Sequence, residues 1–403
     1  MKNLMLCMSG MLLATQINAQ QISTSVSVNA NANTSTSYSY TVNDVKKQVN
    51  VKYSSNMQEV QDDNSVKSKS FTKSFGVDRS DKISLSNQFG SMTIKTWDKN
   101  EIKVDADIKA YAKTEEEAQR LLDQVSISAT KDGDLVSYKT NTGDRNGNWG
   151  SSVRNGKVIW RREVKIHMTV YMPASNALTA SQTYGPLSID DFAGPTSLKV
   201  QYGNLIAGNL SNSNNYISVQ YGKAALRDVN AAKIKQQYGD GLTINTIGNI
   251  DLDAQYSSAK IGTVKGTANI KHQYGSGTTI ETAGALTLSA QYTKIKVGNL
   301  KGNLNGKVQY GRITVDEIES GNKDITINGS YSDIDLGFGA AYNGDFDIST
   351  NYGGGFRYGS NVTTKKLGED RGYNSVKNYS GQVGKGGTAK INIRTDYGSI
   401  TFK

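Results

Sequence analysis

Four pairs of closely spaced aspartates are the first candidates for chemistry in this sequence. They are Asp190 with Asp191, Asp251 with Asp253, Asp333 with Asp335, and Asp345 with Asp347. Glycoside hydrolysis needs two carboxyl groups at a defined separation, so a polysaccharide hydrolase or lyase is one hypothesis. We favour the solvent-exposed side of a strand for the spaced pairs, because they alternate with apolar residues. The sequence also has no His and Arg-x-Lys motifs of the polygalacturonase type beside these acids.

The two histidines, His167 and His272, stand alone, without an acid or a second histidine nearby in the sequence. A metal site or a nucleophilic site needs several such groups together. Glycine-rich calcium repeats and a phosphate-binding loop are also missing. We therefore predict no catalytic, metal-binding or cofactor-binding residues, and no enzyme activity.

Tryptophan and arginine are favoured in recognition surfaces, and they gather around one Asn- and Gly-rich loop. The candidate binding residues are Arg145, Trp149, Arg154, Trp160, Arg161 and Arg162. The alternative is a flexible loop next to an ordinary strand. Lysines of the repeats described below predict only a broken basic stripe, because their positions within the repeat differ. They include Lys223, Lys235, Lys271, Lys294 and Lys307.

The strongest pattern is a repeat centred on a Gln-Tyr pair. It occurs at residues 201–202, 220–221, 237–238, 255–256, 273–274, 291–292 and 309–310, so these tyrosines follow one another at 17 to 19 residues. Apolar or small residues lie six, four and two positions before the tyrosine, as do Ile250, Leu252 and Ala254 before Tyr256. This period of two predicts a strand with one buried side, with the tyrosine pointing inward and the glutamine outward.

Apolar residues fall three and five positions after the tyrosine, as Ile295 and Val297 do after Tyr292, so a corner must separate two strands. The glycine that usually follows the tyrosine suits such a corner, because it tolerates positive φ. A unit of about 18 residues is too short for a propeller blade and has no helical period. We therefore predict an all-β fold, a single-stranded parallel β-helix, right-handed by the general twist of strands.

Equivalent residues of successive coils should form ladders spaced by about 4.8 Å. The sequence thus predicts a glutamine ladder that pairs amides along the axis, and tyrosine rings aligned in the interior. The expected ladder comprises Tyr184, Tyr202, Tyr221, Tyr238, Tyr256, Tyr274, Tyr292, Tyr310, Tyr331, Tyr352 and Tyr397.

The segments before the array predict four parts of the chain. Residues 1–19 read as a secretory signal peptide, 20–70 as a polar Ser/Thr/Asn-rich leader, 71–175 as a small α+β cap, and 176–403 as the repeat domain. Within the cap, residues 83–94 match one coil, with Phe89 in place of tyrosine. Residues 114–117 form a capping box ahead of a short amphipathic helix. Residues 361–390 break the register and should close the other end.

The single cysteine, Cys7, lies in the predicted signal, so the mature chain needs no oxidant to fold. The net charge of +10 suits polyanions, although a mild lysine excess on an ordinary surface explains it too. No second long apolar run follows the signal, so we expect no transmembrane segment in the mature chain.

Three stretches resemble a family of bacterial exported proteins known as putative adhesins, a domain of unknown function. They are residues 82–104 (KISLSNQFGSMTIKTWDKNEIKV), the helix TEEEAQRLLDQV, and residues 164–189, which are followed by the Tyr-Gly coils. The resemblance implies a parallel β-helix, a location in the periplasm, at the outer membrane or on the cell surface, and a role in adhesion without cofactors.

We therefore expect a non-enzymatic envelope or surface protein that binds glycans, lipopolysaccharide, other polyanions or envelope proteins, with no specificity for nucleic acid. A carbohydrate-active enzyme and an accessory protein of envelope-stress signalling are the alternatives.

Overall fold

The computed structural model describes residues 38–42, 45–49, 62, 64–143, 148–155, 157–367 and 376–403. The predicted signal peptide lies outside them. Two compact units are distinguished, one of Met1–Asp62 with Val153–Ile159 and one of Asp63–Ser152 with Trp160–Lys403. In the first unit, β1 (Tyr38–Val42) and β2 (Val45–Val49) pair antiparallel.

The all-β class is confirmed, since one helix accompanies 28 strands in the described residues. After β2 come β3 (Ser65–Gly76), β4 (Lys82–Gln88), β5 (Gly90–Thr96), β6 (Glu101–Ala112), α1 (Glu115–Asp123), β7 (Ser126–Asp132), β8 (Leu135–Asn141), β9 (Gly150–Arg154) and β10 (Lys157–Met172).

The region of the repeats then begins. It contains β11 (Ala177–Thr183), β12 (Leu187–Ile189), β13 (Thr196–Gln201), β14 (Leu205–Ala207), β15 (Asn215–Gln220), β16 (Lys223–Gln237), β17 (Gly241–Gln291), β18 (Lys294–Leu300), β19 (Leu304–Gln309), β20 (Arg312–Ile318), β21 (Asp324–Ser330), β22 (Asp333–Phe338), β23 (Gly344–Asn351), β24 (Gly355–Tyr358), β25 (Val362–Leu367), β26 (Lys377–Val383), β27 (Ala389–Asp396) and β28 (Ser399–Phe402).

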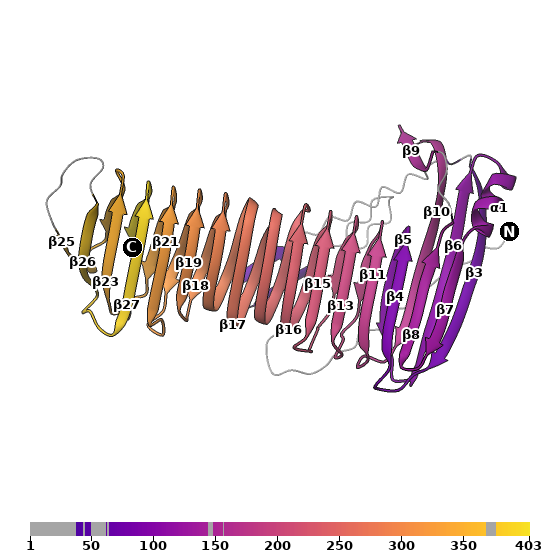
Figure 1. Cartoon of the computed structure of the whole chain (residues 1–403), viewed down its shortest axis with the longest axis horizontal. Helices are drawn as coiled ribbons and strands as arrows, with labels where there is room; N and C mark the ends of the chain where they lie inside the picture. The colour runs from indigo at the N-terminus through magenta and orange to yellow at the C-terminus, as the bar shows by residue number, and fades with distance from the viewer. Residues whose placement is uncertain are drawn as a thin grey trace. The chain divides into compact units, whose positions relative to one another are not determined.

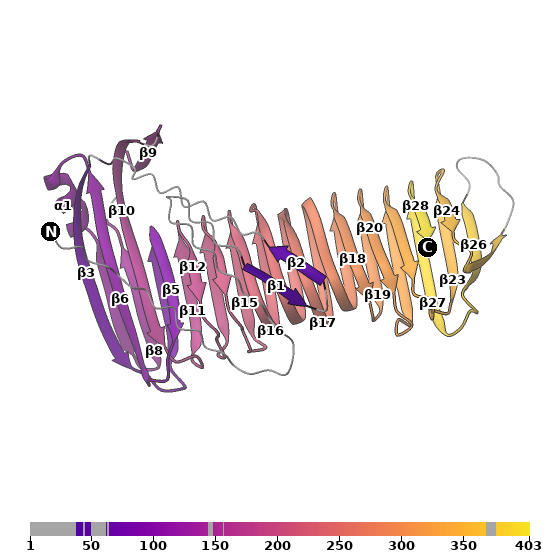
Figure 2. The ribbon, with the colours of Figure 1, turned by 180° about the vertical axis from the view of Figure 1, so that it is seen from behind.

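Strands of successive repeats pair in parallel, in two rows. The strand before each tyrosine pairs with its counterpart one repeat on, as Leu198 does with Ile217 and Ile217 with Ile234. This first row includes β4, β11, β13, β15, β19 and β21 (Figure 1). The strands after the tyrosine form the second row, which includes β5, β12, β18, β20, β28 and β24 (Figure 2).

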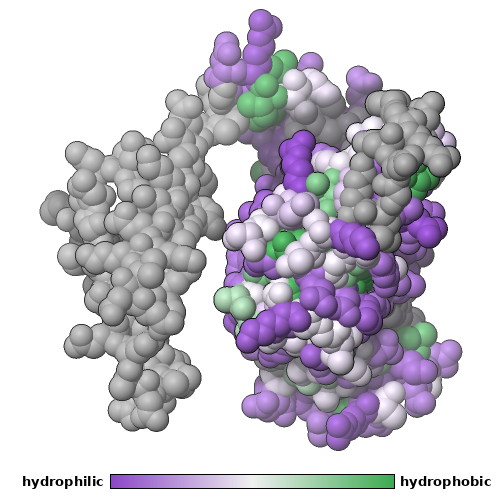
Figure 3. Space-filling view, turned by 90° about the vertical axis from the view of Figure 1, so that its left-hand side faces the viewer, coloured by the Kyte–Doolittle hydropathy of each residue, from purple (hydrophilic) through white to green (hydrophobic). Residues whose placement is uncertain are grey.

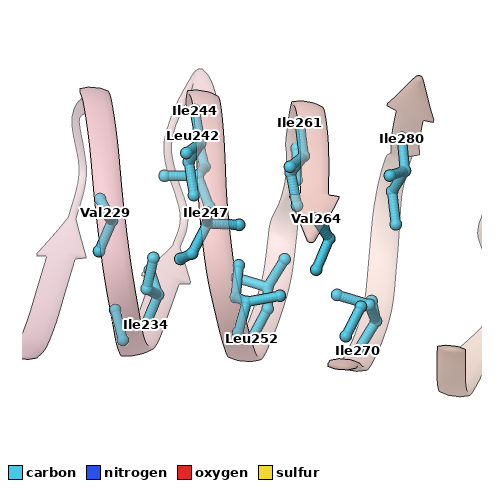
Figure 4. Packing of buried hydrophobic residues seen from close by; sticks show 14 of the residues in the cluster. Val229, Ile234, Leu242, Ile244, Ile247, Leu252, Ile261, Val264, Ile270 and Ile280 are labelled. Atoms are coloured by element: carbon cyan, nitrogen blue, oxygen red, sulfur yellow. The ribbon is translucent and has the colours of Figure 1, made fainter. Parts of the chain in front are cut away.

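The core lies between the two rows and follows the predicted period of two. Ile250, Leu252 and Ala254 are buried before the corner of one coil, and Ile295 and Val297 after the corner of another. Ile234, Leu252 and Ile270 in the first row face Ile244, Ile261 and Ile280 in the second row (Figure 4). Each coil therefore buries apolar side chains against both its own second strand and the neighbouring coils, which is how a repeat with little core of its own is stabilised.

The prediction that the tyrosines point inward is wrong. All eleven have φ between 47° and 57°, and their side chains are 36–53% exposed. A single residue in the left-handed conformation reverses the alternation of the strand, so glutamine and tyrosine both point outward and the next residue points inward. The corner therefore sits on the tyrosine, and the glycine after it has another purpose.

That purpose is close approach of backbones. A Cβ on Gly222 would lie 1.7 Å from the carbonyl oxygen of Gly203 in the preceding coil, and one on Gly203 would lie 1.9 Å from that of Gly185. The substitution Gly222→Ala should therefore lower the free energy of unfolding by about 1–3 kcal/mol, since a packed backbone has to move. Urea unfolding measures the loss. Gly355→Ala is the control, because a Cβ added there would meet no other atom within 4 Å, and an equal loss there would contradict the argument.

The coil around Phe89 is stacked directly on the array although it precedes it by almost a hundred residues, since β4 pairs with β11 and β5 with β12. Beyond it lie antiparallel strands: β6 pairs with β10 and β3, and β7 with β8. The strands β7 and β8 form a hairpin, with Gly133 at φ 53° in its turn. The predicted helix is present as α1, and the Thr114 hydroxyl accepts from the Glu117 backbone N–H at 3.3 Å.

At the C-terminal end, the chain reverses the order of its last coils. Strand β27 pairs with β21 on one side and β23 on the other, although β23 precedes it in the sequence (Figure 1). Strand β26 then pairs antiparallel with β23, and β25 pairs antiparallel with β26. The face of this end is mostly hydrophilic, as is typical of a terminal repeat that closes a stack (Figure 3).

Candidate functional site

An exposed ladder of stacked aromatic rings is the most regular surface feature of the chain. It runs from Phe89 through the tyrosines to Tyr331, Tyr397 and finally Tyr352. Neighbouring ring centroids are 4.4–5.4 Å apart, and the ring planes lie within 16° of parallel. The faces of the rings are therefore covered by their neighbours, whereas their edges and hydroxyl groups meet solvent.

The backbone at the ladder is strained. The left-handed conformation costs a residue with a side chain about 1–2 kcal/mol, and glycine or asparagine adopts it more readily. Aromatic stacking stabilises the fold by about 0.5–1.5 kcal/mol per pair, which roughly offsets the cost of the left-handed backbone. Tyrosine at eleven equivalent positions is therefore not explained by the stability of the corner alone. Strain repeated at equivalent positions points to a role for the exposed ring.

The predicted glutamine ladder is present beside the rings. The side-chain amide of Gln220 donates to the oxygen of Gln237 at 2.9 Å, and Gln237 donates to Gln255 at 3.1 Å. Gln273 donates to Gln291 at 3.1 Å in the same way. One surface thus carries a row of phenols that repeats once per coil and, in the seven coils with a Gln-Tyr pair, a row of amides.

A groove of about 570 Å³ opens on the other side of the rings. It is lined by Tyr292, Tyr310 and Tyr331 together with Lys294 and Arg312, which both lie two positions after a ladder tyrosine. Arg312 already pairs with Asp333 at 2.7 Å and with Asp335 at 3.3 Å. Its charge is therefore largely neutralised within the protein.

The six candidate binding residues of the sequence are only partly brought together. Arg145 lies outside the described residues, and Arg154 belongs to the first compact unit. The guanidinium of Arg162 donates to Glu117 at 2.7 Å and lies 5.8 Å from the ring centre of Trp149. Trp149 in turn packs against Phe89, the first ring of the ladder.

The remaining two candidates lie close by. Arg161 donates to Glu163 at 2.7 Å and stacks 3.3 Å above the ring of Tyr111, whereas Trp160 is 40% exposed. Two of the four candidates in the second unit thus carry charges that are paired internally. A binding role for these residues remains a prediction.

The aspartate pairs are engaged in exposed ion pairs. Asp191 accepts from Arg227 at 2.6 and 2.8 Å, and Asp251 lies 3.6 Å from Lys233. Asp345 lies 3.0 Å from Lys390, and its pKa is lowered chiefly by the hydrogen bond from that lysine. A carboxylate whose pKa is lowered, as at Asp345, is a poor general acid near neutral pH.

His272 is fully buried two positions before Tyr274, with Nδ1 2.7 Å from the Thr278 hydroxyl. The same interior corner holds other polar side chains that reach the backbone. Gln236, for example, donates to the Gly222 carbonyl at 2.8 Å. The sequence pattern predicted apolar or small residues here and missed this polar corner, because five of the coils do carry valine or alanine.

Burial lowers the pKa of His272, so the native protein resists protonating it. An unfolded histidine titrates near 6.5, and stability is therefore lost as pH falls below that value, by up to about 1.4 kcal/mol per pH unit. Above it, both states are neutral and the effect vanishes. We expect His272→Val, which introduces the residue of three other coils, to reduce this loss. Urea unfolding at pH 7.5 and pH 5 tests it, and an equal loss in both proteins would contradict it.

Comparisons with known proteins found no matching family model and no matching curated protein. Similar solved structures include a putative adhesin from Parabacteroides distasonis, 13% identical, covering 83% of this chain and 97% of that one, with a TM-score of 0.28. A putative adhesin from Parabacteroides merdae is 10% identical (83% and 96% covered, TM-score 0.30). A putative cell adhesion protein from Clostridium sporogenes is 13% identical (84% and 99% covered, TM-score 0.16). Similarity of this extent carries no information on ligand or activity.

None of the helices in the described part of the chain is long and apolar enough to cross a membrane.

Proposed function

We propose that this chain is a non-enzymatic, exported protein of the cell envelope or surface that binds extended polymers, in the manner of an adhesin. We further infer that its stacked coils are a single-stranded parallel β-helix, with α1 and the antiparallel strands as its N-terminal cap. The observation that carries the proposal is the exposed ladder of eleven tyrosines at strained backbone positions.

A ladder of this kind suits a ligand that is itself periodic. Each coil adds one phenol hydroxyl and, in seven coils, one glutamine amide to the same surface. A folded partner with an irregular surface meets such a row at few points, whereas a linear polymer meets it along its length. A sugar ring in an extended glycan advances by about as much as one coil, so its hydroxyl groups can be met repeatedly. Glycans are therefore the polymers that we favour.

The absence of enzyme activity is part of the proposal. It is supported by the ion pairs that Asp191, Asp251 and Asp345 make with basic side chains on exposed strand faces, and by the lowered pKa of Asp345. Sites that hydrolyse glycosides instead keep one carboxyl group protonated near neutral pH.

Binding of the mature chain to a panel of linear polysaccharides, neutral and acidic, tests the proposal. We expect the double substitution Tyr256→Asn and Tyr274→Asn to weaken binding, because asparagine accepts the left-handed backbone but removes two adjacent rings. The control is Tyr358→Asn, which changes a tyrosine that is 50% exposed but lies outside the ladder. Equal binding by all three proteins, or binding to no polysaccharide, would overturn the proposal.

A further inference from the structure

Cations alternate with uncharged or acidic residues along one line beside the ladder, three positions before each ring. In spatial order the residues at this position are Ser86, Ser181, Lys199, Ser218, Lys235, Asp253, Lys271, Ser289, Lys307, Asn328, Arg394 and Ser349. From Lys199 to Arg394, every second coil therefore carries a positive charge. We call these five residues the cation row: Lys199, Lys235, Lys271, Lys307 and Arg394.

The alternation holds in space but not in sequence. Along the chain, Asn328 is followed by Ser349 and only then by Arg394. Because β27 lies between β21 and β23, Arg394 pairs with Asn328 and with Ser349, which returns it to the two-coil spacing. The lysines read as a broken stripe in the sequence because Lys223 and Lys294 lie at a different position of the repeat from Lys235, Lys271 and Lys307.

Among the described residues, the members of the cation row have no ion-pair partner, although Asp253 stands opposite Lys235 in the strand pairing. Several other cations of the coils have acidic partners, such as Lys296 with Asp316 at 3.1 Å and Lys390 with Asp345 at 3.0 Å, whereas Lys260 and Lys294 make no ion pair among the described residues. Within the part of the chain that the structure describes, no member of the cation row makes an ion pair. One acidic residue stands in the line, Asp253, and it accepts from the Gln255 amide at 3.3 Å.

Like charges on directly opposed residues of neighbouring strands repel, and this explains why cations are not adjacent. It does not explain why a cation returns at every second coil. Two coils span about 9.6 Å at the usual strand spacing. This is about one Debye length at physiological ionic strength, so each charge acts largely by itself on a ligand.

We propose that the cation row binds a linear acidic polysaccharide that carries one carboxylate or sulfate group per disaccharide. The inference rests on the proposed function, since the glutamine and tyrosine rows would meet the sugar hydroxyls. From Lys199 to Lys307, two coils offer one cation, two amides and two phenols, and one disaccharide offers one anion and two rings. Nucleic acid fits less well, because its charges recur about every 3.4 Å along a strand.

Three probes test whether the spacing of the cation row matches the spacing of anions on the polymer. They are hyaluronan, with one carboxylate per disaccharide, polygalacturonate, with one carboxylate per sugar, and neutral dextran. We expect hyaluronan to bind most tightly. The triple substitution Lys235→Gln, Lys271→Gln, Lys307→Gln should weaken hyaluronan binding at least about tenfold. The matched control is Lys223→Gln, Lys260→Gln, Lys296→Gln, which removes the same charge from exposed positions outside the row and should have a much smaller effect.

A variant of unchanged net charge tests the spacing itself. The double substitution Lys271→Gln, Ser289→Lys moves one cation by a single coil within the row, and we expect it to weaken hyaluronan binding as well. Equal losses in the triple variant and its control, unchanged binding on moving the cation, or tighter binding of single-stranded DNA would each overturn the inference. Tyrosine-dependent binding of dextran as tight as that of hyaluronan would overturn it too, while leaving the proposed function standing.

Discussion

The substitution Phe402→Ala should lower the free energy of unfolding by about 3–5 kcal/mol, the usual cost of emptying a buried phenylalanine site. Phe402 is 1% exposed. Its ring lies 4.9 Å from that of Phe338, 5.0 Å from that of Phe356 and 5.5 Å from that of Phe346, all edge to face. These four rings join β22, β23, β24 and β28, so the cavity would weaken the end of the stack. Urea unfolding measures the loss.

The control is Tyr358→Ala, which removes an aromatic ring from neighbouring β24 that is 50% exposed and should cost far less. In a stack of repeats each coil contacts only its neighbours, so the damage should stay local. Amide hydrogen exchange should therefore show lost protection in β23, β27 and β28, and unchanged protection in β13 and β15. Uniform loss along the array would show that the coils unfold together, and equal costs for the two substitutions would refute the packing argument.

The sequence was sufficient to predict the coils because the buried pattern repeats so regularly. Ile250, Leu252 and Ala254 lie where a period of two places them, and Phe89 could be recognised as the centre of a distant coil from the same template. The glutamine ladder also followed from parity alone, since Gln237 and Gln255 project from equivalent outward positions.

The direction of the tyrosines could not be predicted in this way. The alternation of a strand assigns every second residue to the same side. One residue in the left-handed conformation shifts this assignment by one position. Tyrosine gives no local signal for that conformation, which favours glycine and asparagine. The following glycine drew attention to the corner, but the left-handed residue common to all the corners is the tyrosine, and a glycine such as Gly222 allows the close approach to Gly203.

The place of Arg394 was equally hidden. Residues 389–402 repeat the template, and the simplest expectation puts their coil last. Strand pairing with β21 requires the chain to return past β23, and only the spatial order shows this. The cation row depends on the spatial order of the coils, so it cannot be found from the sequence. The candidate loop with Trp149 could be found from the sequence, but the charges of Arg161 and Arg162 next to it are paired within the protein.

Binding of hyaluronan should depend steeply on salt if the cation row carries it. Each cation that meets an anion releases counterions, and for single-stranded nucleic acid the affinity falls with a logarithmic slope of about −0.7 per contact. Five contacts would then weaken binding about 10²-fold between 50 and 200 mM salt. A polymer of lower charge density condenses fewer counterions, so we expect a loss of about 10- to 100-fold.

The slope also counts the cations engaged, which makes it a sharper measurement than affinity alone. The triple variant that lacks Lys235, Lys271 and Lys307 retains two members of the row, and its slope should fall to about two fifths of the wild-type value. The control triple variant should keep the full slope, although its net charge is the same. If both variants lose slope equally, hyaluronan is held by the diffuse positive charge of the chain, and the two-coil period has no part in recognition.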